Sequence, residues 1–113
     1  MLIDYLNGST KARTELDRFE KIYMSVISWM EILIGTAEGD EESEVRAFLR
    51  RFQVYSLDEG VAERTVEIRR REKIRLPDAV IWATAQRLGL LLVTRNSRDF
   101  PSRDPGIRIP YKL

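Results

Sequence analysis

The apolar run Leu90–Thr94 is the feature that most constrains the fold. Four apolar residues stand in succession there, and a strand of this kind suits a sheet that is covered on both faces. A nearly all-apolar segment precedes it, from Pro77 to about Gly89. Proline suits the first turn of a helix and glycine its end. An apolar helix followed by a buried strand predicts an α/β fold with a parallel sheet.

The rest of the chain alternates between strand and helix patterns. We expect strands at Ile22–Ser25, Gln53–Leu57 and Ile107–Ile109, and helices at Lys11–Glu20, Ser28–Ile34, Glu41–Phe52 and from Asp58 onward. Ser28 and Glu31 fit a capping box at the start of one of these helices. Because no repeat or linker divides the chain, we expect a single domain over residues 1–113.

The sequence contains neither cysteine nor histidine. Their absence excludes disulfides, thiolate and imidazole metal sites, serine–histidine triads and histidine general bases. A metal site would therefore use oxygen ligands, which favours Mg²⁺ or Mn²⁺. No apolar run approaches the roughly 20 residues of a membrane-spanning helix, and no signal peptide is visible. We expect a cytoplasmic protein with no membrane partner.

The formal net charge is only +1, so the total charge does not indicate a strongly basic nucleic-acid binder. Positive charge is concentrated at Arg69–Arg71, with Lys73 and Arg75 close behind. Such a cluster fits the solvated C-terminal end of a helix, where cations interact favourably with the helix dipole. It fits equally well a surface that contacts phosphate groups. The sequence leaves both interpretations open.

Polar residues stand in apolar surroundings at three places. Glu31 lies in the helix after Ser25, Asp78 begins the most apolar helix, and Asn96 and Asp99 follow the Leu90–Thr94 strand. Ligand sites of open parallel sheets lie outside the carboxyl ends of the strands, so we expect these residues at one edge. Each also has a purely structural explanation, as a capping residue, a helix N-terminus or a turn.

Carboxylates that gather without basic partners repel one another unless protons or a divalent cation hold them together. In a chain without histidine or cysteine, carboxylate-held Mg²⁺ or Mn²⁺ is the natural solution, and phosphodiester hydrolysis is the chemistry that such an ion serves. Thr94 and Arg95 are candidate phosphate contacts. Trp82 lies inside the apolar helix, so we expect it in the core.

At these residues the sequence resembles the PIN-domain ribonucleases, and among them the VapC toxins of toxin–antitoxin pairs. Four segments in the family's order carry the resemblance: Leu2–Gly8, Ser25–Gly35, Leu76–Ala85 and Leu92–Phe100. The resemblance implies a three-layer α/β/α sandwich with a parallel sheet. It also implies a Mg²⁺- or Mn²⁺-dependent endoribonuclease that cuts single-stranded regions of RNA.

The same resemblance assigns roles to individual residues. It implies a catalytic group of Glu31, Asp78, Asn96 and Asp99, in which the metal ligands are Glu31, Asp78 and Asp99. Asn96 takes a position that is aspartate in many relatives, and Thr94 supports the site, with Arg95 beside it as a substrate contact. The implied partners are a VapB-type antitoxin, the RNA substrate and a second copy in a homodimer.

The resemblance also predicts a departure from the family. Its members begin with an apolar strand that ends in aspartate, ahead of the segment matched by Leu2–Gly8. We therefore expect this chain to lack the central strand and its aspartate, which leaves the two flanking strands without a shared partner. Either the chain is read from a late start codon, which we favour, or another subunit or a closed-up sheet fills the gap. We expect the short form to be weakly active or inactive.

Two other functions remain open. A degenerate PIN domain could bind antitoxin or RNA without cutting it, and both the missing aspartate and Asn96 favour this alternative. A phosphoacceptor domain of receiver type also gathers acids at strand ends, but the lysine expected near the last strand is not apparent, since Thr94, Arg95 and Asn96 stand there.

Overall fold

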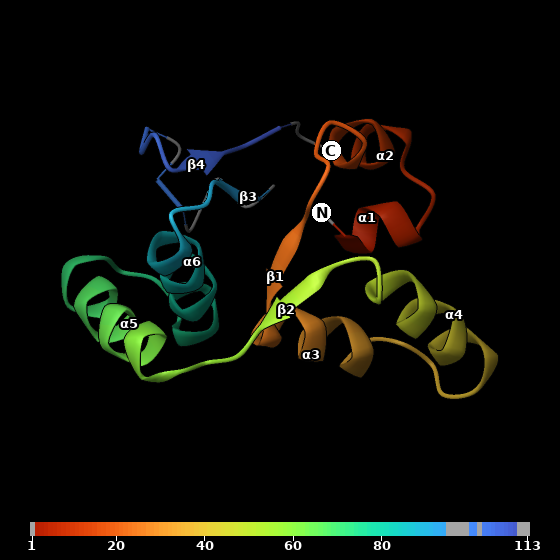
Figure 1. Cartoon of the computed structure of the whole chain (residues 1–113), viewed down its shortest axis with the longest axis horizontal. Helices are drawn as coiled ribbons and strands as arrows, with labels where there is room; N and C mark the ends of the chain where they lie inside the picture. The colour runs from red at the N-terminus through yellow and green to blue at the C-terminus, as the bar shows by residue number, and fades with distance from the viewer. Residues whose placement is uncertain (1, 95–99, 102, 111–113) are drawn as a thin grey trace. The chain divides into compact units, whose positions relative to one another are not determined.

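The computed structural model describes residues 2–94, 100–101 and 103–110, with only the backbone of Ile3 and Asp4 (Figure 1). The described chain divides into two compact units, Leu2–Ser56 and the part from Leu57 onward. Each unit is described by itself, because their relative placement is not defined.

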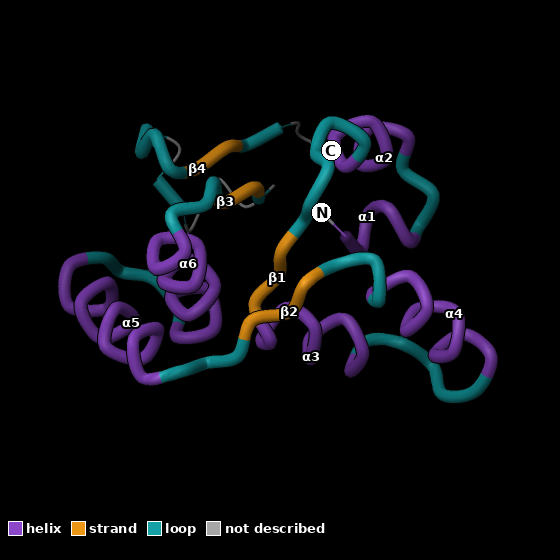
Figure 2. Tube along the Cα trace, in the orientation of Figure 1, coloured by secondary structure: helices purple, strands orange, loops and turns teal. Residues whose placement is uncertain are grey.

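The Leu2–Ser56 unit contains four helices and one pair of strands among its described residues. In chain order they are α1 (Leu2–Leu6), α2 (Thr10–Leu16), β1 (Tyr23–Ser25), α3 (Val26–Ile34), α4 (Asp40–Leu49) and β2 (Gln53–Tyr55). The strands β1 and β2 run parallel with Met24 opposite Val54, and Figure 2 shows them side by side. A parallel pair needs a long crossover connection, which α3 and α4 supply here.

The core of this unit lies between the helices and β1. Its buried members are Met24, Ile32, Val45, Leu49 and Phe52. Phe48 extends this core toward α1, because its ring stacks on Tyr5 at 4.8 Å between centroids and meets the edge of Phe52 at 5.0 Å. These contacts explain why the apolar positions of α4 recur at helical spacing.

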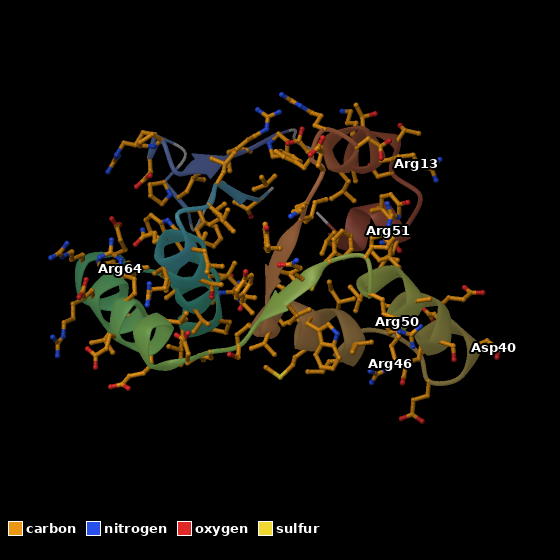
Figure 3. The ribbon with its side chains drawn as sticks, in the orientation of Figure 1. Arg13, Asp40, Arg46, Arg50, Arg51 and Arg64 are labelled. Atoms are coloured by element: carbon orange, nitrogen blue, oxygen red, sulfur yellow. The ribbon has the colours of Figure 1, made fainter. Side chains whose placement is uncertain are left out.

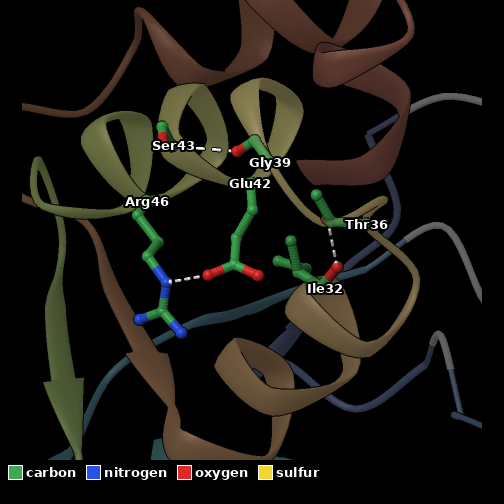
Figure 4. A network of polar contacts seen from close by, with 6 residues as sticks. All are labelled: Ile32, Thr36, Gly39, Glu42, Ser43 and Arg46. Atoms are coloured by element: carbon green, nitrogen blue, oxygen red, sulfur yellow. Dashed lines mark hydrogen bonds and ion pairs between the residues drawn. The ribbon is translucent and has the colours of Figure 1, made fainter.

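Local polar contacts fix the connection from α3 to α4 (Figure 4). The Thr36 hydroxyl donates to the Ile32 carbonyl at 2.7 Å, and Arg46 Nε donates to Glu42 Oε2 at 2.9 Å within α4. Gly39 precedes α4 with a φ of 98°, a backbone conformation that residues with a Cβ rarely adopt. The Thr36 hydrogen bond therefore holds the end of α3, and Gly39 permits the turn into α4.

The unit from Leu57 onward contains α5 (Glu59–Arg71), α6 (Leu76–Leu88), β3 (Leu92–Val93) and β4 (Ile107–Arg108) among its described residues. Asp58 caps α5, since its Oδ1 accepts a hydrogen bond from the Val61 amide at 2.8 Å. Pro77 stands in the first turn of α6, which ends at Gly89 with a φ of 67°. The predicted helix boundaries at Asp58, Pro77 and Gly89 are confirmed.

Packing between α5 and α6 builds the core of the second unit. Val61, Thr65 and Ile68 are the buried face of α5. On α6 the buried residues are Ala79, Val80, Trp82, Ala83 and Thr84, and the Trp82 ring meets the edge of Phe100 at 6.1 Å. The strands β3 and β4 are parallel, with Leu92 opposite Ile107. The prediction that Trp82 belongs to the core is confirmed, because its exposed fraction is 4%.

The α/β class and the parallel pairing of strands are confirmed, but several details differ from the expectations. The helices predicted at Lys11–Glu20 and Glu41–Phe52 end at Leu16 and Leu49, and the strand predicted at Gln53–Leu57 ends at Tyr55. The helix α3 begins at Val26 rather than Ser28. The predicted strand Leu90–Thr94 is reduced to Leu92–Val93, and Leu91 is 45% exposed rather than covered. The described strands form two separate two-stranded sheets, β1 with β2 and β3 with β4, and no described strand joins the two sheets. Across the described ranges, no helix is long and apolar enough to cross a membrane.

Candidate functional site

Asp78 lies in the first turn of α6, where a negative charge interacts favourably with the helix dipole. Its side chain is 14% exposed. Arg75, at the N-cap position, donates to Asp78 Oδ2 from Nε at 3.3 Å and from Nη2 at 3.2 Å. Both of these hydrogen bonds use the same carboxylate oxygen, so the guanidinium does not bridge the two oxygens in a forked pair.

Glu31 lies in the middle of α3 and is exposed, whereas the next residue, Ile32, is buried. The predicted capping box between Ser28 and Glu31 is wrong, because α3 has already begun at Val26. Ser25 is the N-cap instead, and its Oγ accepts a hydrogen bond from the Ile27 amide at 3.1 Å. This removes the structural explanation that the sequence offered for Glu31.

Thr94 follows β3 and is half-buried, and its amide donates to the Arg108 carbonyl at 3.0 Å. This bond continues the β3–β4 pairing by one residue, so the backbone of Thr94 is held at the end of the strand. Arg95, Asn96 and Asp99 lie outside the described residues.

Glu31 belongs to the Leu2–Ser56 unit and Asp78 to the unit from Leu57 onward. The convergence of these two carboxylates therefore stays a prediction. Within the part of the chain that the structure describes, no three acidic side chains are grouped as a metal cage. The donor chemistry does fit a hard divalent cation, because both candidate ligands offer carboxylate oxygens and Asp78 is engaged by Arg75 through one oxygen only.

The sequence analysis did not predict the ion pair between Arg75 and Asp78. Its signal is present, since the two residues are three positions apart and oppositely charged. Such spacing brings side chains together on a helix surface.

A cavity of about 440 Å³ lies at the other end of α6. Trp82, Gln86 and Gly89 line it together with the turn Asp104–Gly106. Asp78 is not among its lining residues, so this cavity is separate from the first turn of α6.

The PIN domain family model matches residues 1–104, and this chain belongs to that family. The match begins at the opening helix and includes both Glu31 and Asp78. No curated protein matches the sequence.

Solved structures extend this finding. A toxin–antitoxin complex from Klebsiella pneumoniae contains a chain 37% identical to this one, with a TM-score of 0.92, and the match covers 99% of this chain and 93% of that one. The DNA-bound VapBC from Salmonella typhimurium matches at 26% identity and a TM-score of 0.75, over 95% and 88% of the two chains. FitAcB from Neisseria gonorrhoeae, at 24% identity, a TM-score of 0.74 and coverage of 93% and 88%, shows the shared fold alone.

Proposed function

We propose that this chain is a Mg²⁺- or Mn²⁺-dependent endoribonuclease and the toxin of a VapBC-type toxin–antitoxin pair. One observation carries the proposal: the PIN match spans residues 1–104 and includes two carboxylates, Glu31 and Asp78, at the positions that the sequence analysis singled out. PIN domains are generally nucleases. The likeness to chains of toxin–antitoxin complexes supports the biological role.

The proposed metal ligands are Glu31, Asp78 and Asp99, and Asn96 completes the catalytic group. When bound, a divalent ion at these residues activates water and neutralises charge on the phosphate oxygens. Thr94 and Arg95 contact the substrate in this proposal. The half-buried Thr94 is suited to orienting a neighbouring group, because its backbone is fixed to Arg108.

The proposed partners are an antitoxin of the VapB type and a second copy of this chain, and the proposed location is the cytoplasm. An antitoxin segment would cover the acidic residues, with an arginine reaching their carboxylates. The contact between Arg75 and Asp78 supports this idea, because it shows that a guanidinium fits this carboxylate. We also propose that residues 1–113 form one domain, since the family match includes most of both units.

The test is RNA cleavage by the purified chain at high enzyme concentration, with Mg²⁺ or Mn²⁺ and with EDTA. We expect cleavage that depends on the metal and is lost in Glu31→Gln and Asp78→Asn, while both variants keep the wild-type circular dichroism spectrum. Full activity in either variant would show that the site is assigned to the wrong residues.

A degenerate PIN domain that binds antitoxin or RNA without cutting is the second candidate. The ion pair between Arg75 and Asp78 favours it, because a carboxylate that already has a cationic partner has less need of a metal ion. Calorimetric titration with Mn²⁺ separates the two candidates. A nuclease binds the ion with measurable heat, and the degenerate domain gives no heat above that of dilution.

A further inference from the structure

The turn between α5 and α6 carries the densest positive charge of the sequence. Arg69–Arg75 contains five cationic residues and one acidic residue. The structure shows that these residues close the turn that leads directly into the first turn of α6, where Asp78 lies. The cationic cluster and the candidate metal ligand therefore belong to one short segment of one unit.

The backbone of this turn is held by internal contacts. Arg69 Nη1 donates to the Ile74 carbonyl, and the Ile74 side chain is 4% exposed. The Glu72 amide donates to the Ile68 carbonyl at 2.8 Å, which closes the end of α5. A turn anchored in this way presents its outer side chains from a fixed backbone, so less conformational entropy is lost when they bind a ligand.

The five cations divide into two groups. Arg69 donates a hydrogen bond across the turn to the Ile74 carbonyl, and Arg75 pairs with Asp78. The remaining three, Arg70, Arg71 and Lys73, are exposed and make no ion pair with any residue that the structure describes. Consecutive residues at a helix end diverge by about 100°, so Arg70 and Arg71 extend around the end of α5.

We infer that Arg70, Arg71 and Lys73 bind the phosphate backbone of the RNA beside the bond to be cut. This inference rests on the proposed function and names a substrate-binding surface for it. Arginine and lysine are the residues that neutralise phosphates, and each contact of this kind makes binding weaker as salt concentration rises. A backbone contact next to Asp78 would also fix the register of the strand at the carboxylate without reading its sequence.

The chain provides a matched control at the end of α4. Arg50 is the C-cap of α4 and Arg51 follows it, and both are exposed and labelled in Figure 3. The Arg51 guanidinium lies over the Phe48 ring, 5.7 Å from its centroid. Neutralising Arg50 and Arg51 removes the same charge from two adjacent arginines just beyond the end of a helix. It does so in the other unit, on a segment of the chain that does not include Asp78.

The experiment measures binding of a fluorescein-labelled single-stranded oligouridylate by anisotropy, in EDTA, across a series of salt concentrations. Each phosphate contact contributes a slope of about −0.7 in the plot of log K against log salt for a single strand. We expect Arg70→Gln/Arg71→Gln to reduce the slope by about 1.4 and to weaken binding roughly tenfold near 0.1 M salt. Arg50→Gln/Arg51→Gln should leave the slope unchanged, and Arg70→Lys/Arg71→Lys should retain it.

The inference would be overturned if Arg70→Gln/Arg71→Gln and Arg50→Gln/Arg51→Gln reduced the salt slope and the affinity equally, since RNA binding would then depend only on net charge. An unchanged salt slope in Arg70→Gln/Arg71→Gln would overturn the inference too. That is also the result expected if the cluster binds an acidic protein partner and not RNA. So would wild-type binding weaker than a Kd of about 10⁻⁴ M. Because EDTA prevents metal-dependent cleavage, the binding result stands apart from the proposed activity, which fails separately if the metal-loaded wild type does not cut RNA.

Discussion

The two helices that carry the candidate carboxylates place them in opposite surroundings. On α6, Asp78 is 14% exposed in the first turn and is paired with Arg75. On α3, Glu31 is exposed in the middle of the helix, and its carboxylate makes no ion pair with any of the described residues. Both segments are rich in apolar residues, but α6 buries five of its 13 residues, whereas α3 buries only Ile32 and leaves Ile34 83% exposed.

The difference shows that an acid in an apolar segment can arise for different reasons. A charge at Asp78 gains from the helix dipole and from Arg75, so its presence has a structural explanation. Glu31 gains from neither, and its predicted capping role is wrong. Glu31 is therefore the stronger of the two indications of function, although the sequence alone ranked them equally.

The largest expected effect is on catalysis. If both carboxylates hold the metal, Glu31→Gln and Asp78→Asn should each reduce the weak RNA cleavage expected of this chain to background, because the ion would supply several kcal/mol of transition-state stabilisation. Cleavage of a labelled RNA under single-turnover conditions measures this. If only Glu31→Gln is inactive, the comparison is sharpened, since Asp78 would then serve α6 alone. If only Asp78→Asn is inactive, the comparison breaks down.

The next effect is on stability and contrasts the buried face of α6 with the exposed face of α3. Trp82→Ala should lower the free energy of unfolding by about 3–5 kcal/mol, because it empties a buried position against Phe100. Ile34→Ala removes an exposed side chain and should change it by less than about 0.5 kcal/mol. Urea denaturation followed by circular dichroism gives both values.

A large loss in Ile34→Ala would mean that the exposed face of α3 is covered in solution. Repeating the measurement at two protein concentrations tests whether a second copy of the chain buries this face, because burial in a homodimer makes the loss of stability depend on concentration.

The sequence predicted those parts of the fold that depend on local signals. The cap at Asp58, the proline in the first turn of α6 and the glycine at its end each act through their own backbone geometry. The start of α3 was wrong because Ser25 and Ser28 are both good capping residues and no proline or glycine separates β1 from α3. The pattern alone could not choose between them.

For the candidate site, the sequence could predict which residues belong to it but not how they are arranged. Glu31 and Asp78 stand out by chemistry, but whether they meet depends on how two units of the chain pack, which local patterns do not encode. The partner of Asp78 was encoded locally, in the three-residue spacing from Arg75. Pairing between neighbours on one helix was thus accessible to sequence reasoning, and convergence between helices was not.

A smaller effect tests the corrected start of α3. Ser25→Ala should lower the free energy of unfolding by about 1 kcal/mol, because the Ile27 amide loses its acceptor. Ser28→Ala lies within the helix and should change it by less than about 0.5 kcal/mol, since alanine is the better helix former. Thermal unfolding of the two variants under identical conditions decides between them, and the reverse order would restore the capping box at Ser28 and Glu31.

The smallest effect concerns the pair that distinguishes Asp78 from Glu31. A metal ion that binds Asp78 competes with Arg75 for the same carboxylate, so Arg75→Gln should tighten Mn²⁺ binding. Arg75 is 75% exposed, and pairs of this kind contribute about 0.2–1 kcal/mol, which corresponds to a gain of at most about fivefold. Calorimetric titration of the wild type, Arg75→Gln, Asp78→Asn and the double variant measures the coupling between the two residues. The gain should vanish in the Asp78→Asn background, because the amide carries no charge for Arg75 to hold. A gain that persists there would show that Arg75 acts by repelling the ion through space, and Asp78 would then differ from Glu31 by its position on the helix and not by its partner.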